Sequence, residues 1–327
     1  MELSPSMQLR RIAVAHLLPR CLHVVAELGV ADHLSDAPMS AETLARACGA
    51  HAGALERMLR LLAVEAIFES RGGAWVHSES SRLLRSDHPQ SMRPLLRMLG
   101  SRIMWQAAGE LGHSLRSGAS AIEHVAPEGI WSYYSQRPDE ARVFDAAMTA
   151  KAEEDIATLI PAFDFKPYKL IADIGGGRGH VLSAVLGAAP GARGILFDLP
   201  QVLAPLAPMD RIRHQAGSFF TDPLPAADAY ILSNVIHDWA DAESETILRG
   251  VRRAAPAHAE LLLLEILMPD GPGMHPAKVL DVLMLAVTGG LERTRTQYEK
   301  LLASSGFSID RIVPTAGPIS VIVGRPV

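Results

Sequence analysis

The spacing of apolar residues along the chain changes near residue 165. Before that point, apolar residues recur three and four positions apart in segments such as 43–48 and 55–62. This period places them on one face of a helix, so it predicts a bundle of amphipathic helices. Gly49 and Gly53 stand where such helices are expected to end or to begin again.

Beyond residue 165, short aliphatic runs alternate with helical segments. The runs cover residues 170–174, 194–197, 229–232 and 261–266. Strands that are buried on both faces lose the alternation of apolar and polar residues, so this pattern predicts a mostly parallel sheet wrapped by helices. Two further runs, 309–313 and 319–323, flank a Pro-Thr-Ala-Gly-Pro turn and predict a terminal hairpin. The predicted fold class is therefore α/β.

Length and composition indicate a globular protein with two regions. The chain has 327 residues, more than a usual single domain, and 48% of them are apolar while 20% are charged. Its net charge of -5 supplies no basic field for a phosphate backbone. Nucleic acid is therefore not expected as a partner.

The chain is expected to work in the cytoplasm. Cys21 and Cys48 have neither metal-ligand spacing nor the abundance of a secreted disulfide scaffold. Polar residues interrupt the apolar stretch 12–28, which argues against a signal sequence and against a membrane span. The interruptions are His16, Pro19, Arg20, His23 and Glu27.

A glycine-rich segment, Asp-Ile-Gly-Gly-Gly-Arg-Gly at 173–179, follows the first run of the second half. Glycine lets the backbone approach a ligand closely at a strand-to-helix turn, which predicts a nucleotide-type site. A dinucleotide fingerprint would need glycine at 180, where His180 stands, whereas glycines at 175, 177 and 179 after an acid suit S-adenosylmethionine. The Asp173 carboxylate would repel a pyrophosphate but attract an ammonium and a sulfonium. The alternative is a tight turn that binds no ligand.

The second strand supports the same cofactor. It ends at Asp198 in Phe-Asp-Leu-Pro, 197–200, about twenty residues beyond the glycines. A carboxylate at this place can accept hydrogen bonds from both ribose hydroxyls. The alternative role for Asp198 is a helix cap.

The fourth strand leads into a candidate base. His237 comes just past the end of the run 229–232, at the edge where ligands bind in open parallel sheets. Glu265 ends the next strand and Glu292 lies in a later loop, so two carboxylates can converge on the imidazole. A carboxylate bonded to one ring nitrogen fixes the tautomer and leaves the other nitrogen free to accept a proton. Alone, a histidine here would more often be structural.

From about residue 20 to its end, the chain resembles the small-molecule O-methyltransferases typified by plant caffeic acid O-methyltransferase and by bacterial enzymes that modify antibiotics, polyketides and phenazines. The shared segments occur in the family's order. They are Leu-Gly-Val-Ala-Asp-His-Leu at 28–34, the glycine-rich segment at 173–179, Phe-Asp-Leu-Pro at 197–200, His-Asp-Trp at 237–239 and Gly-Gly-Leu-Glu-Arg-Thr at 289–294.

The resemblance implies a class I methyltransferase fold, which is Rossmann-like, with an N-terminal helical, winged-helix-like dimerisation region. We expect residues 1–100 to form that region, 101–165 to form a helical linker that covers the substrate, and 166–327 to form the catalytic domain that binds the cofactor. The resemblance also implies a homodimer built mainly by the N-terminal helices.

The implied reaction transfers a methyl group from S-adenosylmethionine to a hydroxyl of a small aromatic molecule and leaves S-adenosylhomocysteine. His237 is implied as the general base, flanked by Glu265 and Glu292. A phenol has a pKa near 10, so at neutral pH an imidazole with a pKa of about 6.5 could take its proton. The residues expected to bind the cofactor are Asp173, Gly175, Gly177, Asp198, Leu199, Ser218, Phe219 and Ser233.

Some positions depart from the family's pattern. Many members have an acid followed by Met or Phe after the third strand, where this chain has Ser218 and Phe219. Ser218 is expected to hydrogen-bond the cofactor and Phe219 to pack on its adenine ring. Ser233 stands where plant enzymes carry Lys, and Asn234 stands where bacterial relatives often have Arg. The sequence assigns these last two departures no consequence.

The resemblance places Met148 and Met284 near the acceptor ring, with Trp131 and Phe144 as further candidates. Flexible and flat side chains suit an aromatic ligand. The alternative for all four is plain core packing, since methionines and aromatics at helical spacing usually serve that role. The abundance of Arg over Lys fits specialised metabolism in a bacterium with a GC-rich genome.

Three other functions stay open at this point. Residues 40–87 are similar to a winged helix-turn-helix, yet Glu56, Glu65 and Glu69 offset the basic residues that would read DNA. Some relatives with this fold bind the cofactor without methylating and act as decarboxylases or hydroxylases, but these would be expected to lose the base. Metal-assisted methylation would use His237, Asp238 and Glu265, and adjacent His and Asp side chains are expected to point apart, so no metal is expected.

Overall fold

The computed structural model describes residues 4–327, which form two compact units. One unit contains the residues up to Trp105 together with Tyr134–Lys151, and the other contains Gln106–Tyr133 together with Ala152–Val327. Helix α12 (Pro138–Ala162) begins in the first unit and ends in the second. The division at residues 100 and 165 stays a prediction.

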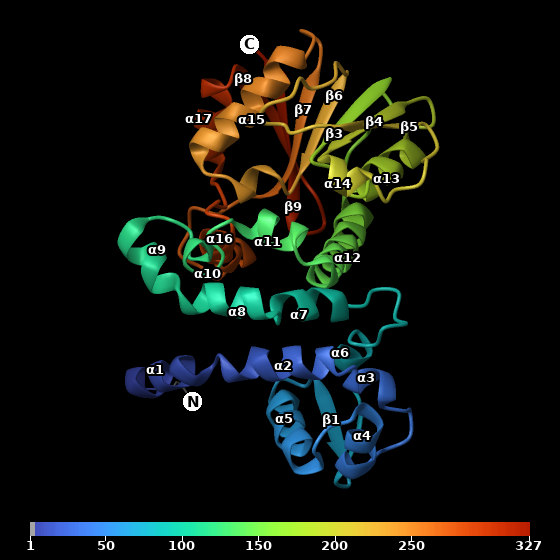
Figure 1. Cartoon of the computed structure of the whole chain (residues 1–327), viewed down its shortest axis with the longest axis vertical. Coiled ribbons are helices and arrows are strands. Elements are labelled where there is room, and N and C mark those ends of the chain that lie inside the picture. Colours follow the sequence, from blue (N-terminus) through green and yellow to red (C-terminus); the bar gives the residue numbers. More distant parts are fainter. Residues whose placement is uncertain (1–3) are drawn as a thin grey trace. The chain divides into compact units, whose positions relative to one another are not determined.

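The second unit is built on a seven-stranded sheet (Figure 1), which confirms the α/β fold class. Its spatial order is β5-β4-β3-β6-β7-β9-β8. Strands β3 to β7 run parallel, and β9 lies antiparallel between β7 and β8. Each predicted run falls inside a strand. The strands are β3 (Leu170–Ile174), β4 (Arg193–Asp198), β5 (Ile212–Ala216), β6 (Ala229–Ser233), β7 (Glu260–Ile266), β8 (Phe307–Pro314) and β9 (Ile319–Pro326).

The order of the strands reverses between β3 and β6. From β3 the chain moves outward to β4 and β5, and it then returns to β6 on the other side of β3. In open parallel sheets, ligands usually bind at the carboxyl ends of the strands where the strand order reverses.

Helices cover both faces of this sheet, because its central strands are apolar on both sides. Ile171, Leu196 and Leu262 face a core shared with α12, α13 and α16. Ala172, Ile195 and their neighbours face a second core shared with α15 and α17. The elements of this unit outside the sheet are α9 (Leu111–Ser117), α10 (Ile122–Val125), α13 (His180–Ala188), α14 (Pro200–Leu203), the 3-10 helix η1 (Ile236–Asp238), α15 (Asp241–Ala254), α16 (Pro276–Val287) and α17 (Arg295–Ser304).

The first unit is helical, with one small hairpin. Its apolar helix faces meet in a core that includes Leu44, Leu59 and Trp75. Ser40 caps α4 by accepting a hydrogen bond from the amide of Thr43, as its position predicts. The elements are α1 (Pro5–Val14), α2 (Leu17–Glu27), α3 (Val30–His33), α4 (Ala41–Cys48), α5 (Ala52–Val64), β1 (Phe68–Arg71), β2 (Ala74–His77), α6 (Glu79–Arg82) and α7 (Arg93–Leu99); α8 (Arg102–Gly109) and α11 (Ile130–Ser135) cross the unit boundaries.

The strand pair β1 and β2 lies where a wing is expected in residues 40–87, the region similar to a winged helix-turn-helix. Its register pairs Glu69 with Val76 and Ser70 with Trp75. The indole nitrogen of Trp75 donates to a carboxylate oxygen of Glu56 at 2.8 Å, which ties the wing to α5. An acidic side chain that serves packing in this way supports a structural role for the winged region.

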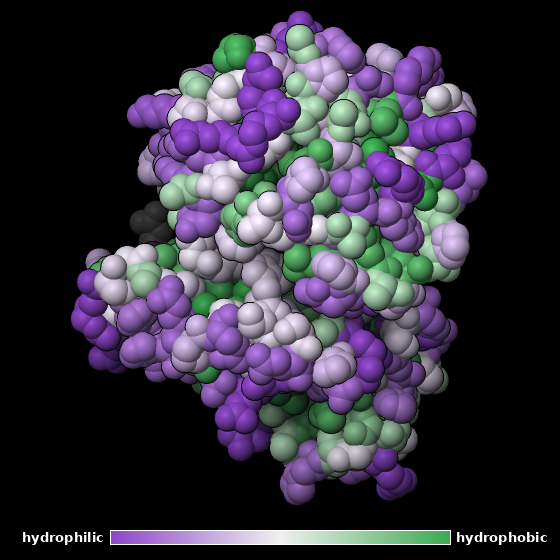
Figure 2. Space-filling view, turned by 45° about the horizontal axis from the view of Figure 1, so that its top comes forward, coloured by the Kyte–Doolittle hydropathy of each residue, from purple (hydrophilic) through white to green (hydrophobic). Residues whose placement is uncertain are grey.

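The face shown in Figure 2 is largely hydrophilic, and its apolar residues lie in smaller groups. This surface agrees with the ordinary charged content of the chain. Within residues 4–327, none of the helices combines the length and the apolar character needed to cross a bilayer.

Candidate active site

Polar side chains gather where the parallel strands of the second unit end. Asp173 is the penultimate residue of β3, Asp198 ends β4, Ser233 ends β6, and Glu265 is the penultimate residue of β7. Because these strands run parallel, their carboxyl ends share one edge of the sheet. The predicted cofactor and base residues therefore come from the same edge.

The glycine-rich turn after β3 needs glycine for two different reasons. Gly175 and Gly177 have φ of 70° and 58°, a region that L side chains rarely adopt. Gly176 is required by space, since a Cβ there would lie 2.5 Å from Asp173 Cγ. The amide of Gly177 donates to Asp198 Oδ2 at 2.8 Å, which links the turn to the end of β4.

Asp173 is a buried carboxylate, and among residues 4–327 neither of its oxygens has a hydrogen-bond partner. Burial, and after it the charge of Asp198, raises the pKa of Asp173 to about 7. An uncompensated carboxylate is costly inside a protein. A cationic ligand at this place would remove that cost.

These features fit S-adenosylmethionine. Asp173 offers an acidic, unpaired group to the cofactor's positive charges. Asp198 uses one oxygen for Gly177 and the other for the amide of Leu199, and each oxygen keeps a lone pair that can accept a ribose hydroxyl. Nothing lies within 4 Å of the place where a Cβ on Gly177 would be, so the turn leaves space for a ligand.

Further predicted cofactor residues border this turn. The Phe219 ring lies 3.4 Å from the place of a Cβ on Gly175 and meets Trp239 edge-on, with centroids 6.0 Å apart. Ser218 donates its amide to the carboxylate of Asp222 at 2.7 Å. The Phe219 ring therefore lies beside the glycine-rich turn, and the Ser218 hydroxyl accepts the amide of Phe220 at 3.3 Å.

Asn234, which the sequence left without a role, has an unusual backbone. Its φ is 51°, and its amide side chain donates to Asp155 Oδ2 in α12 at 3.2 Å and also contacts Ser233 Oγ at 3.3 Å. Asn tolerates this left-handed conformation better than most residues. Its side chain joins the loop that leads to His237 with the second half of α12.

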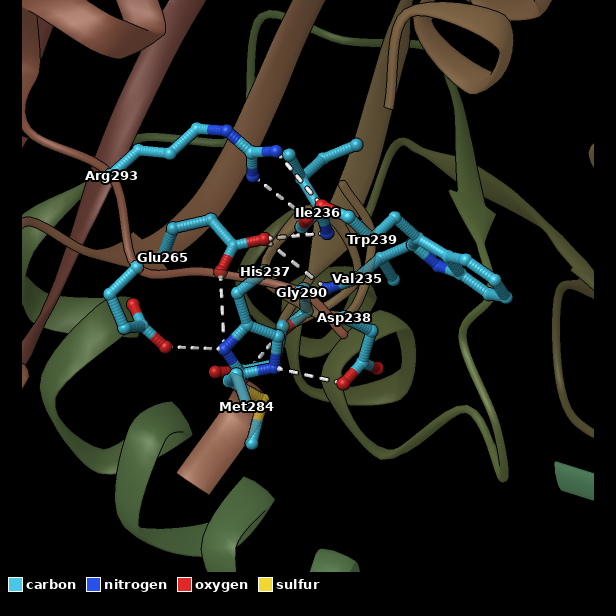
Figure 3. A network of polar contacts seen from close by, with 12 residues as sticks. Val235, Ile236, His237, Asp238, Trp239, Glu265, Met284, Gly290 and Arg293 are labelled. Atoms are coloured by element: carbon cyan, nitrogen blue, oxygen red, sulfur yellow. Dashed lines mark hydrogen bonds and ion pairs between the residues drawn. The ribbon is translucent and has the colours of Figure 1, made fainter. Parts of the chain in front are cut away.

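The candidate base His237 lies in η1 and is 7% exposed. Its Nδ1 is hydrogen-bonded to Glu292 Oε1 at 2.8 Å, while Glu265 Oε2 lies 3.8 Å from the same nitrogen (Figure 3). The two predicted carboxylates do converge on the ring. Asp238 Oδ1 lies 3.8 Å from Nε2, so the expectation that these adjacent side chains point apart is wrong, because η1 is a single 3-10 turn rather than the start of an α-helix.

The charge around the ring determines how it titrates. Burial alone lowers the pKa of His237, but Glu265, Asp238 and Glu292 outweigh it and raise the pKa to about 9. Burial raises the pKa of Glu265 to about 7, against the attraction of His237. The imidazole is therefore a stronger base than free histidine.

Backbone contacts hold the elements around His237. Glu265 Oε1 accepts the amides of Val235 at 3.2 Å and Ile236 at 2.9 Å, so this carboxylate also fixes the entry to η1. Gly290 packs so closely that a Cβ there would lie 1.9 Å from the His237 carbonyl oxygen. The loop that carries Glu292 therefore lies directly against the backbone of the base.

The four predicted acceptor residues divide between the two units. Met284 is buried in α16 and is drawn beside the imidazole in Figure 3, and Trp131, 40% exposed, belongs to the same unit. Phe144 and Met148 lie in the part of α12 that belongs to the first unit, where Phe144 packs on Tyr134 with centroids 4.8 Å apart. Their role at an acceptor stays a prediction.

Sequence reasoning missed Gly290 and Arg293. Both stand inside the quoted segment 289–294, in which only Glu292 was given a role. A second glycine beside Gly289 and an arginine directly after Glu292 were the available signals. Within residues 4–327, no group of three His, Cys, Asp or Glu side chains is arranged to hold a metal ion.

Comparison with known proteins identifies the family. A model of the O-methyltransferase domain matches residues 109–308, and a model of the O-methyltransferase dimerisation domain matches residues 11–87. The chain therefore belongs to the O-methyltransferase family. It is an S-adenosylmethionine-dependent O-methyltransferase, which confirms the predicted enzyme class and cofactor.

Individual relatives span nearly the whole chain. The chain is 38% identical to phenazine O-methyltransferase PhzM of Lysobacter antibioticus, over 98% of this chain and 96% of that protein. The crystal structure of LaPhzM is also 38% identical in sequence and superposes with a TM-score of 0.91 over 99% of this chain and 100% of that one. CalO1, a methyltransferase of calicheamicin biosynthesis solved with S-adenosylhomocysteine bound, is 32% identical and superposes with a TM-score of 0.88 over the full length of both chains.

Another relative acts on a different atom. The chain is 36% identical to the 8-amino-8-demethylriboflavin N,N-dimethyltransferase of Streptomyces davaonensis, over 93% of this chain and 90% of that protein. That relative is therefore named for a nitrogen acceptor, within the same range of identity as the O-methyltransferases.

Proposed function

We propose that this enzyme methylates a hydroxyl of a small aromatic metabolite and that His237 is its general base. The observation that carries the proposal is the bond between His237 Nδ1 and buried Glu292. It assigns the hydrogen to Nδ1 and leaves Nε2 to accept a proton. Asp238 Oδ1 lies 3.8 Å from Nε2, beyond hydrogen-bond distance, so Nε2 is the nitrogen assigned here to the acceptor hydroxyl.

The residues of the chain would divide the work of the reaction. S-adenosylmethionine, when bound, supplies a methyl group activated by its sulfonium. His237 takes the hydroxyl proton at Nε2 while the oxygen attacks in line, and Glu292 and Glu265 stabilise the imidazolium that results. The enzyme otherwise holds the reacting atoms in line, since the displacement needs no covalent chemistry from the protein.

The charge around His237 favours a phenol as the acceptor. Proton transfer from a phenol becomes less unfavourable as the pKa of the base rises, and the pKa of His237, about 9, lies closer to the value near 10 of a phenol than the 6.5 of free histidine does. The relatives support the same class, since one modifies phenazines and another acts in mitomycin biosynthesis. We infer a flat, hydroxylated aromatic acceptor from specialised metabolism.

Transfer of a labelled methyl group tests this function. The enzyme would be incubated with methyl-labelled S-adenosylmethionine and hydroxylated phenazines, naphthoates and simple phenols, each beside the same compound with its oxygen already methylated. Label is expected on the free hydroxyl compounds only. Label on amino-substituted rings with none on any phenol would overturn the hydroxyl as the acceptor, and absence of label on every compound would overturn the proposed class of flat, hydroxylated aromatic acceptors.

The rate should depend on pH in the direction set by the three carboxylates. The protonated imidazole cannot accept a proton, so kcat/KM is expected to rise with pH up to about 9. Glu265→Gln removes one of the charges that raise the pKa of His237, so the rising limb should move to lower pH. The measurement is kcat/KM of the unmodified enzyme and of Glu265→Gln from about pH 6 to 10. This range roughly spans the reference pKa values of histidine and of a phenol. A rising limb at the same pH in both proteins would contradict the assignment of His237 as the base.

We also propose that Asp173, Gly175, Gly177, Asp198, Leu199, Ser218, Phe219 and Ser233 form the cofactor site. Asp198→Asn keeps the size of the side chain but loses its charge and part of its acceptor capacity. The dissociation constant for S-adenosylhomocysteine should rise about 10- to 100-fold, the effect of lost hydrogen bonds to a charged group. Calorimetric titration measures it, with Asp210→Asn as the matched control, since the Asp210 side chain is 89% exposed. Equal affinities in both variants would refute the ribose contact.

A homodimer through the N-terminal helices is the further part of this proposal. The dimerisation-domain match begins within α1, and α1 buries none of its side chains in its own chain. Met7, Leu9 and Ile12 of α1 are each more than half exposed. An isolated helix of ten residues is marginal in water, so a second copy that covers this apolar side would stabilise it.

A further inference from the structure

Arg293 is a buried arginine that the proposed mechanism does not use. It follows Glu292 in the chain, and its exposed fraction is 0%. A buried guanidinium is stable only when its donors meet acceptors. Those acceptors show what the residue does.

The guanidinium of Arg293 spans the backbone on both sides of the base. Its Nη1 donates to the carbonyl oxygen of Ile236 at 3.0 Å, and its Nη2 donates to the carbonyl oxygen of Trp239 at 2.8 Å (Figure 3). These carbonyls belong to the residue before His237 and to the second residue after it. The 3-10 turn that carries the imidazole is therefore held at both ends by one side chain.

The remaining donors of Arg293 join this turn to α15. Nε and Nη2 donate to Asp241 Oδ1 at 3.0 and 2.8 Å, and Nη2 also contacts Ser244 Oγ at 3.2 Å. The Ser244 hydroxyl in turn lies 3.2 Å from the Trp239 carbonyl oxygen. Asp241 balances the positive charge, while Ser244 contacts the same two carbonyls, since its hydroxyl also lies 3.4 Å from the Ile236 carbonyl oxygen.

We propose that Arg293 is a positioning residue for the methyl transfer, which fixes the backbone of His237 while its neighbour Glu292 fixes the ring. The inference rests on the proposed role of His237 as the base. Two consecutive residues of one loop would then set the place and the orientation of the same imidazole. The close approach of Gly290 to the His237 carbonyl brings that loop within reach.

The geometry requires arginine rather than any cation. A guanidinium is a rigid fork that can reach two carbonyls and a carboxylate at once, whereas the ammonium of lysine is a single point on a flexible stem. Arg293→Lys therefore keeps the charge and loses the simultaneous contacts. The change separates the positioning role from a general electrostatic one.

Several groups affect how His237 titrates. Glu265 from β7, Glu292 from its loop and Asp238 from η1 itself face the imidazole. Tyr298 of α17 is buried and interacts with Glu265, Glu292 and Arg293. None of these residues is altered in Arg293→Lys, so a change in titration would report a displaced ring.

The experiment compares Arg293→Lys with Arg295→Lys in the full chain. Arg295 is 69% exposed and pairs with Glu299 on the same helix, so its replacement by Lys should change nothing. The titration of His237 is followed on each variant by NMR with histidine labelled at Cε1, and the His237 signal is identified by its loss in His237→Gln. The other two measurements are kcat with a phenolic acceptor and affinity for S-adenosylhomocysteine. Ser244→Ala is the milder variant, needed if Arg293→Lys does not fold.

In Arg293→Lys, kcat should fall about 10- to 100-fold, as for a small misplacement of a catalytic group. The midpoint of the His237 titration should move to lower pH while affinity for S-adenosylhomocysteine stays within about twofold. Ser244→Ala should show the same changes at smaller size. An unchanged midpoint with unchanged kcat, or equal losses of kcat and cofactor affinity, would overturn the proposal.

The two proposals fail in different ways. If His237→Gln retained full turnover, His237 would not be the base, and a shifted NMR titration in Arg293→Lys would still show that Arg293 positions the ring. If His237→Gln lost turnover but Arg293→Lys kept both its kcat and its titration midpoint, only the role of Arg293 would be refuted.

Discussion

Replacing His237 with Gln should lower kcat by about 10²- to 10⁴-fold, the usual contribution of a general base. Gln occupies similar space and can still hydrogen-bond Glu292, but its amide is not basic enough to take a proton from the acceptor. The cofactor residues on β3 and β4 are untouched, so affinity for S-adenosylhomocysteine should stay the same. Single-turnover kinetics would measure the methyl-transfer step, and calorimetry would measure the affinity.

The control for this variant is its response to acceptor acidity. A phenol that is already ionised needs no base, so part of the lost rate should return with nitrophenol-type acceptors of low pKa. A structural role for His237 would give the opposite outcome: kcat and cofactor affinity would fall together, and no acceptor would restore the rate.

Replacing Gly290 with Ala should cause the largest loss of stability among these variants. The added Cβ would lie 1.9 Å from the His237 carbonyl oxygen and 2.4 Å from the Asp238 carbonyl carbon, so backbone must move on one side or the other. Overpacking costs about 1–3 kcal/mol where side chains can yield, and backbone yields less readily. The free energy of unfolding should fall by at least about 3 kcal/mol.

The same change should affect catalysis, because the loop that moves carries Glu292. Turnover of the remaining folded enzyme should fall about 100-fold, as expected when a catalytic group shifts by about 1 Å. Gly271→Ala is the matched control, since nothing lies within 4 Å of a Cβ at that position. Denaturant unfolding and kcat below the transition measure both effects. A Gly290→Ala variant as stable and active as Gly271→Ala would show that the contact is easily relieved.

Most of the sheet could be predicted because its central strands are unambiguous. The run Leu261–Leu264 is apolar at every position and lies buried in β7. For strand β5 the sequence predicted only that a third strand precedes Ser218, without its residues. The strand lies at the edge of the sheet and reads Ile-Arg-His-Gln-Ala, with no apolar run to mark it. An edge strand is partly solvated, so it does not need the signal that marks its neighbours.

The site was predictable where its residues follow strands. Asp173, Asp198 and Glu265 are fixed by the topology, because the ends of parallel strands meet at one edge. The role of Arg293 depends on the carbonyl groups that its guanidinium reaches, and backbone carbonyls leave no trace in a sequence. Similarly, the raised pKa of His237 arises from three carboxylates whose distances only the fold defines.

The position of β9 affects how the protein can assemble during synthesis. Strand β7, which carries Glu265, is paired on one side by β6 and on the other by β9, the last strand described. Until residues 319–326 have left the ribosome, one edge of β7 has no neighbour and presents open hydrogen-bonding groups, a template for aggregation. Nascent chains stalled before that point should therefore recruit chaperones, although every predicted catalytic residue has already been made.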